Sequence, residues 1–420
     1  MTDNNTVRNL YRTPGLAVAW CLILLGLCLP FQGYAESGLD SEVGLQGRFF
    51  TEDSPRIARD VTGAVRYRLE YYRRWNDGAD TIEFVPWAIW DSEDSERRHA
   101  DIQDLAWLHV ADSYELRTGI RKVFWGKTES QHLVDIINQT DLSVNPDGEE
   151  KLGQPMVNLS LVRDWGILDL FVMTGHRERR FPGENGRFQI ASLPIAWDEA
   201  EYAHPDEEMH LEFAARWQHY YGDWEWALSH FSGTSRDPLL RVERGPTGPQ
   251  QLIPYYTTID QSGLELQYIW GSWIFKSELI SNTGFGDRFT AGTAGFEYTQ
   301  VGIFDSVMDF GWIAEYSADD RGDGAISAAE HDVFLGGRLS LNDVDSSEVV
   351  FGVNLDVETN EQLYVLEASK RIAEALKIYI DAFVITGSES PPAFGEFNDE
   401  YKTAAFSKDD YIQLELVYYF

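Results

Sequence analysis

Charged side chains of opposite sign occur in two parts of this chain where they could act on a solute electrostatically. The link 126–155 is rich in carboxylates: Glu129, Asp135, Asp141, Asp147, Glu149 and Glu150. Basic side chains recur earlier, at Arg66, Arg68, Arg117 and Arg121. An acidic segment that faces a basic wall would create a transverse field and select solutes by charge and dipole. The alternative is that these arginines only balance local acids, namely Glu70, Glu83 and Glu115.

A second candidate site is the twelve-residue run DDRGDGAISAAE at 319–330, which resembles an EF-hand calcium loop. The residues at the matching ligand positions are Asp319, Asp323, Ala325 (through its carbonyl) and Glu330. Arg321 departs from the pattern, since the third ligand position expects an oxygen donor. We therefore predict at most a weak calcium site, and the alternative is a polar hairpin loop without metal.

Enzymatic chemistry would need a histidine paired with a nucleophile or an acid. His210, His219 and His230 are present, but the sequence contains neither GxSxG nor HExxH. His210 and Gln218 share one parity and are more simply interpreted as lining residues. We expect no enzyme and, apart from the weak calcium loop, no cofactor.

The stretch 177–187 is locally basic. Its basic residues are Arg177, Arg179, Arg180 and Arg187. Such a cluster could attract anionic solutes or lipopolysaccharide phosphates. The other interpretation, which we favour, is a loop whose arginines are tied to nearby carboxylates.

The elements that must position these groups are strands, because apolar and polar residues alternate with period 2 in many segments. We count eighteen such segments, with sixteen as the alternative number. They are 42–51, 64–75, 81–90, 101–111, 114–125, 156–163, 167–175, 209–221, 224–232, 261–270, 273–281, 290–300, 306–316, 332–341, 348–357, 362–371, 376–386 and 411–420. Lengths of this order suit tilted strands that cross a bilayer.

The links between these segments alternate in length. Several odd-to-even links are long: 126–155, 176–208, 233–260 and 387–410. The even-to-odd links are short, as at 112–113, 222–223 and 271–272. Long loops at one end and tight turns at the other are typical of an outer-membrane barrel, with the long loops extracellular and the short turns periplasmic.

The two faces of the segments differ in polarity. In 376–386, Leu376, Ile378 and Ile380 lie on one face, while Lys377 and Asp381 lie on the other. Ionised groups in a dry core would be costly unless paired, whereas in a water-filled lumen they cost little. The apolar face is therefore expected to contact lipid and the charged face to line a lumen.

The N-terminal 35 residues read as a secretory signal rather than as part of the fold. Arg8 and Arg12 precede an apolar run at 16–31, and a small residue, Ala35, closes a cleavage motif. A retained anchor is the alternative. Both cysteines, Cys21 and Cys28, fall in this region, so we expect a cysteine-free mature barrel at 36–420.

Composition makes some classes of binding partner unfavourable. The formal charge is −35, which disfavours nucleic acid and anionic membrane surfaces as partners. Aromatic residues are abundant, with 14 Trp, 20 Tyr and 23 Phe. No later stretch is apolar enough for a membrane-spanning helix. The few residues before the first segment leave no room for a plug domain of an energy-coupled transporter.

The chain ends in YIQLELVYYF, in which Ile412, Leu414, Leu416, Tyr418 and Phe420 share one face. With the signal and the link pattern, this ending resembles the Gram-negative outer-membrane porin-like proteins. The resemblance covers the mature chain as a pattern and its last ten residues specifically. The stretch 119–143 loosely resembles uncharacterised barrels near the alginate-export group. The family implies that Tyr418 and Phe420 form a signal for the barrel-assembly machinery.

The resemblance implies an outer-membrane channel for passive diffusion of small hydrophilic solutes, embedded in lipid and lipopolysaccharide. In porins the third long loop folds inward, which implies a constriction formed by 126–155. Inward carboxylates outnumber inward basic residues by parity, so a cation preference is expected. The alternative function is a specific exporter or importer of a polysaccharide or other charged polymer. The sequence leaves a homotrimer open.

Overall fold

The structure is a computed structural model that describes residues 36–53, 59–191, 193–246, 248–327, 329–389 and 400–420. The expected signal at 1–35 lies outside the described residues. Within the described part there is no α-helix, and no helix there is long and apolar enough to span a membrane.

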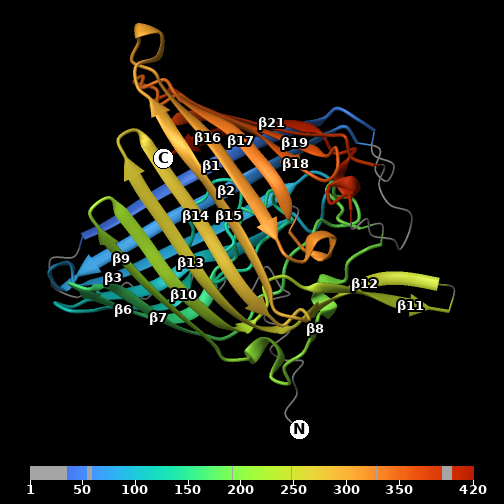
Figure 1. The fold of residues 1–420 in the computed structure, drawn as a ribbon, viewed down its shortest axis with the longest axis horizontal. Coiled ribbons are helices and arrows are strands. Elements are labelled where there is room, and N and C mark those ends of the chain that lie inside the picture. Colours follow the sequence, from blue (N-terminus) through green and yellow to red (C-terminus); the bar gives the residue numbers. More distant parts are fainter. Residues whose placement is uncertain (1–35, 54–58, 192, 247, 328, 390–399) are drawn as a thin grey trace.

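Eighteen antiparallel strands form one closed ring, because β21 pairs with β1. This confirms the expected count of eighteen rather than sixteen (Figure 1). The ring strands are β1 Glu36–Phe50, β2 Val61–Trp75, β3 Asp80–Asp91, β4 His99–Val110, β5 Glu115–Arg121, β6 Gln154–Arg163, β7 Gly166–Met173, β9 Glu212–Tyr221, β10 Trp224–Thr234, β13 Thr258–Trp270, β14 Trp273–Thr283, β15 Phe289–Gln300, β16 Asp309–Asp319, β17 His331–Ser340, β18 Glu348–Asp356, β19 Gln362–Ala373, β20 Leu376–Thr386 and β21 Tyr411–Tyr419.

The register confirms the alternation of faces. In β21, Gln413, Glu415 and Val417 are buried inside the ring, whereas Leu414 and Tyr418 are exposed on the outside. Closure removes the unpaired edges that an open sheet would present. Since the ring has no free edge, every strand can devote one face to the lumen and one to the surroundings.

Short turns and long links lie at opposite ends of the barrel. In Figure 1 the short turns point to the upper left, and the long links lie to the lower right. Two-residue turns such as 222–223 need positive φ to match strand twist, and Gly222 (φ 57°) and Gly271 (φ 60°) supply it. The C-terminus lies at the short-turn end, where the Phe420 N–H donates to Ser41 O.

The long links contain a second sheet that periodicity did not predict. Strands β11 Leu239–Gly245 and β12 Gly248–Tyr256 form a hairpin, and β8 Glu201–Tyr202 pairs with β12. The hairpin projects away from the barrel in Figure 1. Buried Leu193 and Leu252, with Ala191, form a small core beneath it.

Several strand boundaries differ from expectation: β1, β2 and β13 begin earlier, at Glu36, Val61 and Thr258, and β16 ends later, at Asp319. Three others have an identifiable neighbouring feature. The segment expected at 114–125 ends at Arg121, because the Val123 N–H donates to the side chain of Asn138 instead of to a neighbouring strand. The segments expected to begin at 209 and 306 begin at Glu212 and Asp309, each after a single 3-10 turn.

Candidate functional site in the barrel lumen

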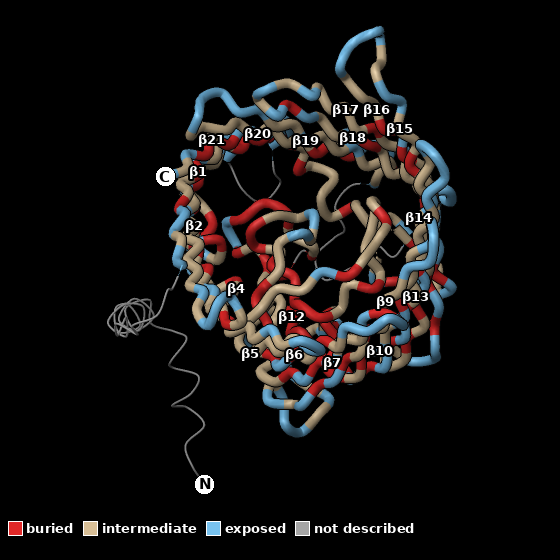
Figure 2. Tube along the Cα trace, turned by 90° about the vertical axis from the view of Figure 1, so that its left-hand side faces the viewer, coloured by how far each residue is buried: buried red, intermediate tan, exposed pale blue. Residues whose placement is uncertain are grey.

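Residues 122–153, here called the inserted segment, connect β5 to β6, and their buried side chains pack against the inner wall of the ring. Figure 2 shows chain inside the ring of labelled strands. Asn138, 1% exposed, holds the two arms of this segment together. Its side chain accepts from Val123 N at 2.8 Å and donates to Arg121 O and Leu152 O, both at 2.8 Å. One amide thus satisfies three backbone groups, those of Arg121, Val123 and Leu152.

An apolar core joins the inserted segment to the wall. Val134 and Ile137 are fully buried and pack with Trp125 against inward side chains of seven strands, β6, β7, β9, β10, β13, β14 and β15. Complete burial of an aliphatic side chain contributes about 1.5–3 kcal/mol. This side of the lumen is therefore closed by side-chain packing and not only by polar contacts.

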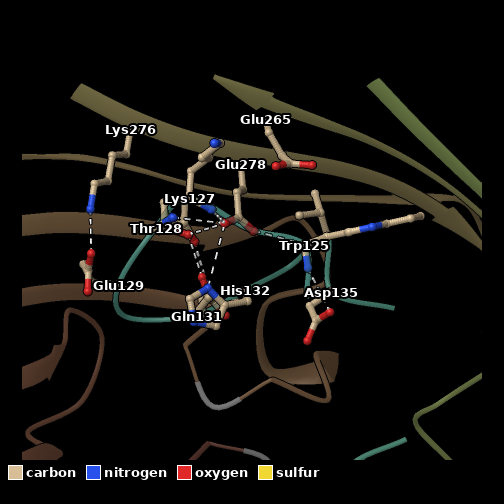
Figure 3. A network of polar contacts seen from close by, with 12 residues as sticks. Trp125, Lys127, Thr128, Glu129, Gln131, His132, Asp135, Glu265, Lys276 and Glu278 are labelled. Carbon is tan, nitrogen blue, oxygen red and sulfur yellow. Dashed lines mark hydrogen bonds and ion pairs between the residues drawn. The ribbon is translucent and has the colours of Figure 1, made fainter. Parts of the chain in front are cut away.

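A wall carboxylate, Glu278 on β14, accepts hydrogen bonds from the backbone of the inserted segment (Figure 3). Its Oε1 accepts from Lys127 N at 2.6 Å, Thr128 N at 3.0 Å and Thr128 Oγ1 at 2.8 Å. Its Oε2 accepts from Val134 N at 3.2 Å. Four donors satisfy the buried charge, which makes Glu278 a positioning group.

A second wall carboxylate repeats this arrangement two strands away. Glu315 on β16 accepts from Glu129 N at 2.9 Å, Ser130 N at 2.8 Å and Ser130 Oγ at 2.6 Å. Between the two, Gln131 Nε2 donates to Thr293 Oγ1 of β15 at 2.8 Å. Three successive strands therefore hold the turn 127–131 by hydrogen bonds.

Glu129 carries the negative charge of this turn and is half-buried. Its carboxylate lies 2.5 Å from Lys276 Nζ and 3.0 Å from Arg338 Nη2, and both cations also approach Glu297. Burial raises the pKa of Glu129, but the hydrogen bond and charge of Lys276 and the charge of Arg338 outweigh it and leave the pKa below its ordinary value. Glu129 is thus held ionised in the lumen.

The structure places Asp141 and Asp135 differently from Glu129. Asp141 is fully buried, 3.0 Å from His99 Nε2 and 3.8 Å from Arg180, and it accepts from Ser143 Oγ at 2.5 Å. The Asp135 side chain is 3% exposed and faces Lys151 at 3.6 Å. Both carboxylates hold the inserted segment together and do not face open lumen.

The predicted basic residues pair with the wall. Arg66 lies 3.1 Å from Glu415 and 3.8 Å from Glu42, and Arg68 lies 3.1 Å from Glu70. Likewise, Arg117 lies 2.5 Å from Glu115, and Arg121 donates to Asn158 at 3.2 Å.

Among the described residues, none of these four arginines pairs with Glu129, Asp135 or Asp141. Sequence reasoning did not select Lys276 and Arg338, the cations that do pair with Glu129. Inward parity was the available signal for both. Parity alone, however, does not show which wall the inserted segment reaches.

Cationic side chains already occupy the calcium-like loop. Lys402 Nζ donates to Asp323 O at 2.5 Å and to Ala325 O at 3.0 Å, and it lies 3.9 Å from Glu330. Arg321 binds the Asp319 carboxylate at 2.9 and 2.5 Å. No cluster of three or more His, Cys, Asp or Glu suited to a metal occurs in the described part of the chain. Calcium binding here stays a prediction that requires displacement of these cations.

Each arginine of the 177–187 stretch has a carboxylate partner. The pairs are Arg177 with Asp101 (2.9 Å), Arg179 with Asp237 (2.7 Å), Arg180 with Glu96 (3.6 Å) and Arg187 with Asp409 (2.7 Å). These contacts match the favoured interpretation of a loop tied by carboxylates. They also join links that are distant in sequence.

The histidines considered for catalysis are dispersed. His210 Nδ1 lies 3.1 Å from Thr234 Oγ1, and His219 packs beside Trp226. On the outer face His230 Nδ1 lies 3.0 Å from Ser262 Oγ, while Asp260 is 4.0 Å from Nε2. The backbone around this pair is engaged in the β10–β13 ladder, which leaves no N–H of these residues to stabilise an oxyanion.

At the end of the chain, Tyr418 and Phe420 are 52% and 63% exposed on the outer face. Their rings stack at a centroid distance of 5.8 Å. Their position at the short-turn rim agrees with the parity from which they were chosen, and their role in assembly stays a prediction.

No family model and no curated protein matches the sequence. Among solved structures, a BenF-like porin from Pseudomonas fluorescens Pf-5 is similar, with a TM-score of 0.53 and 10% identity over 93% of this chain and 99% of that one. OccK8 (OprE) from Pseudomonas aeruginosa is similar with a TM-score of 0.50 and 9% identity, over 92% and 98% of the two chains. At such identities the likeness establishes a shared fold, the closed porin barrel.

Proposed function

We propose that this protein is an outer-membrane channel for passive diffusion of small hydrophilic solutes. The observation that carries the proposal is a closed porin-like barrel whose inward face bears ionised side chains around an inserted segment. Charged groups can line such an interior at low cost only if water occupies it. The outward face, with exposed Leu414, Trp312 and Phe351, suits lipid.

The inserted segment, which contains most of the predicted link 126–155, is the proposed constriction. The contacts of the segment with the wall support this proposal. Two wall carboxylates, Glu278 and Glu315, and the core around Val134 and Ile137 hold the segment inside the ring. A segment held in this way narrows the lumen at a constant place. The Glu129–Lys276–Arg338 group replaces the four predicted arginines as the charged partners of the segment.

The proposed selectivity is for cations. Along the eighteen described strands, inward carboxylates such as Glu83, Glu348, Glu367 and Asp381 outnumber inward basic residues. A lumen that is negative overall concentrates cations and repels anions. No described feature favours the polymer transporter.

Bilayer electrophysiology tests these proposals. Purified protein in planar membranes should give discrete conductance steps, and a salt gradient should give a reversal potential of cationic sign. Small sugars should enter protein-loaded liposomes, whereas a polysaccharide should not. Absence of any current would overturn the channel, and an anionic reversal potential would overturn the charge argument alone.

The proposed location is the outer membrane, reached after cleavage behind Ala35, with lipid, lipopolysaccharide and the assembly machinery as partners. β1 begins at Glu36, so cleavage at this point would leave the described barrel whole. Assembly as a homotrimer is compatible with the fold. Cross-linking of intact outer membranes would reveal it as a band of three times the monomer mass.

A further inference from the structure

The lumen of this barrel is occupied unevenly. Inward side chains in the middle of β6 through β16, here called the filled side, are mostly buried, whereas those nearer the short turns, such as Gln218 and Glu225, are half-buried. Examples from six of these strands are Met156, Phe171, Ala214, Phe231, Ile280 and Ile313. The inserted segment causes this burial through Trp125, Val134 and Ile137.

Inward side chains in the middle of β17 through β20, here called the accessible side, remain open to solvent. Phe334, Asn354 and Asp381 are partly exposed, and Glu367 is exposed although it faces inward. An inward residue can be exposed only to the water of the lumen. Water therefore reaches the middle of this part of the wall, while Leu363, Val365, Phe383 and Ile385 pack in an apolar cluster toward the long links.

Carboxylates of the filled side and the accessible side differ in what neutralises them. Glu278 is saturated by four donors, and Glu265 forms a buried pair with Arg216 at 2.8 Å. Glu367 forms no ion pair within the described ranges, and Asp381, its direct neighbour across the β19–β20 ladder, is bound by the neutral Gln413 at 2.9 Å. Uncompensated charge acts on a passing ion, whereas a compensated carboxylate contributes little net field.

The inserted segment presents its own acids to this region. Asp147 and Glu149 act electrostatically on Glu367, and Glu149 is 67% exposed. The apolar surface of the segment thus faces the filled side, and an acidic part of it faces the accessible side. Both observations give the accessible side the larger excess of negative charge.

We propose that the conducting path runs along β17–β20 and that Glu367 is a specificity-determining residue for hydrated monovalent cations. The proposal rests on the channel function above and deepens it. It differs from the sequence-based expectation, which located the charged wall at β2 and β5.

Cysteine labelling tests the path, because both native cysteines precede residue 36. Two variants, Glu367→Cys and Ser369→Cys, place the thiol on the accessible side. Two controls, Ala214→Cys and Ala291→Cys, place the same thiol on the filled side. The probe is a trimethylammonium-bearing methanethiosulfonate added to open channels. The first two should lose conductance within the same recording, and the two controls should not change.

Selectivity is tested by Glu367→Gln, which should lower the potassium-to-chloride permeability ratio by about twofold or more. Glu374→Gln, on the short turn outside the lumen, is the matched control and should not change it. If labelling affects Ala214→Cys or Ala291→Cys but not Glu367→Cys, the proposed path is wrong. If Glu367→Gln keeps the parental ratio, its role in specificity is wrong. Absence of current in the parent would instead overturn the channel function itself.

Discussion

Glu278 and Glu315 lie on the inner wall as acceptors for backbone N–H groups that belong to no strand. Glu129 lies on the inserted segment and carries charge toward Lys276 and Arg338. Glu367 has neither kind of partner in the described part of the chain. Residues of one type therefore take structural, bridging and solvent-facing roles, according to the donors that surround each carboxylate.

We predict that Glu278→Gln loosens the inserted segment. Glutamine is uncharged, and each hydrogen bond to a charged group contributes about 1.5–3 kcal/mol. Amide exchange at Lys127 and Thr128 should accelerate by at least tenfold, and open-channel noise should rise. The control is Glu348→Gln, a lumen-facing carboxylate near Arg338 (3.7 Å) that should leave both readouts unchanged. Parental exchange in Glu278→Gln would contradict the assigned role.

A pH dependence is predicted for the contact between the 320–330 link and Lys402. Burial, with the neighbouring Asp332 and Asp356 carboxylates, raises the pKa of Glu330 from 4.5 to about 7 despite the lowering effect of Lys402. Between pH 4.5 and about pH 7, Glu330 keeps its proton while the contact with Lys402 is formed and releases it when the contact opens. The contact therefore weakens as pH rises from about 4.5 to 7.

Hydrogen–deuterium exchange at matched pH measures this effect. Parent and Glu330→Gln should exchange alike at pH 4.5, and the parent should exchange faster in this link at pH 7.5. The difference between the two proteins at each pH removes the intrinsic pH dependence of exchange. A constant difference across the window would show that Glu330 does not control the contact.

At the scale of elements, the ring strands all have the same architecture, and the links between them differ in where they fold. Residues 122–153 enter the lumen, while β11 and β12 extend a hairpin away from it. The two links fold in different places because their apolar residues are buried in different places. Val134 and Ile137 pack against the apolar inner wall of the ring, whereas Leu252 packs with Ala191 and Leu193 of the long links.

Deletion of 129–150 is predicted to raise single-channel conductance severalfold, because it removes the segment that fills one side of the lumen. It also exposes inward residues such as Phe171 and Ile280 to water, so thermal stability should fall. Removal of 242–250, the end of the projecting hairpin, is the control and should leave conductance unchanged. Heat-modifiable migration establishes that each variant folds, and an unchanged current after the first deletion would place the segment outside the path.

At the scale of the whole molecule, closure depends on the pairing of the first and last strands. β21 pairs with β1 from Tyr411 to Tyr419, and the terminal Phe420 N–H donates to Ser41. The ring is complete only when the final residues of the chain are in place. The ring of Phe420 stays exposed at the rim of the closed barrel.

We predict that Phe420→Asp or its removal reduces the amount of assembled barrel and increases degradation before insertion. A charge replaces an apolar ring that is 63% exposed at the outer rim. Phe304→Asp, at a ring 89% exposed on a short turn of the same end, is the control and should assemble normally. The fraction of heat-modifiable protein measures the outcome, and equal fractions in parent and Phe420→Asp would contradict an assembly role.

The sequence by itself determined the strands of the ring and their faces, because alternation with period 2 is a local property of each segment, and it favoured eighteen strands over sixteen. It also separated short from long links, and from these the closed barrel follows. The basic residues of the wall were identified by parity, as Arg66 illustrates, and Glu129 was identified by its place in the long link 126–155.

The tertiary structure decided which of those charges meet. Glu129 lies beside Lys276 and Arg338, which are more than a hundred residues away, because the inserted segment crosses to β14–β17. The contact of Lys402 with the calcium-like loop is likewise a long-range contact. Lys402 lies in a different link, and no local sequence pattern connects that link to 319–330. Partners across a lumen are set by how loops pack, and that packing depends on burial of Val134 and Ile137 against distant strands, a long-range free energy that no local pattern encodes.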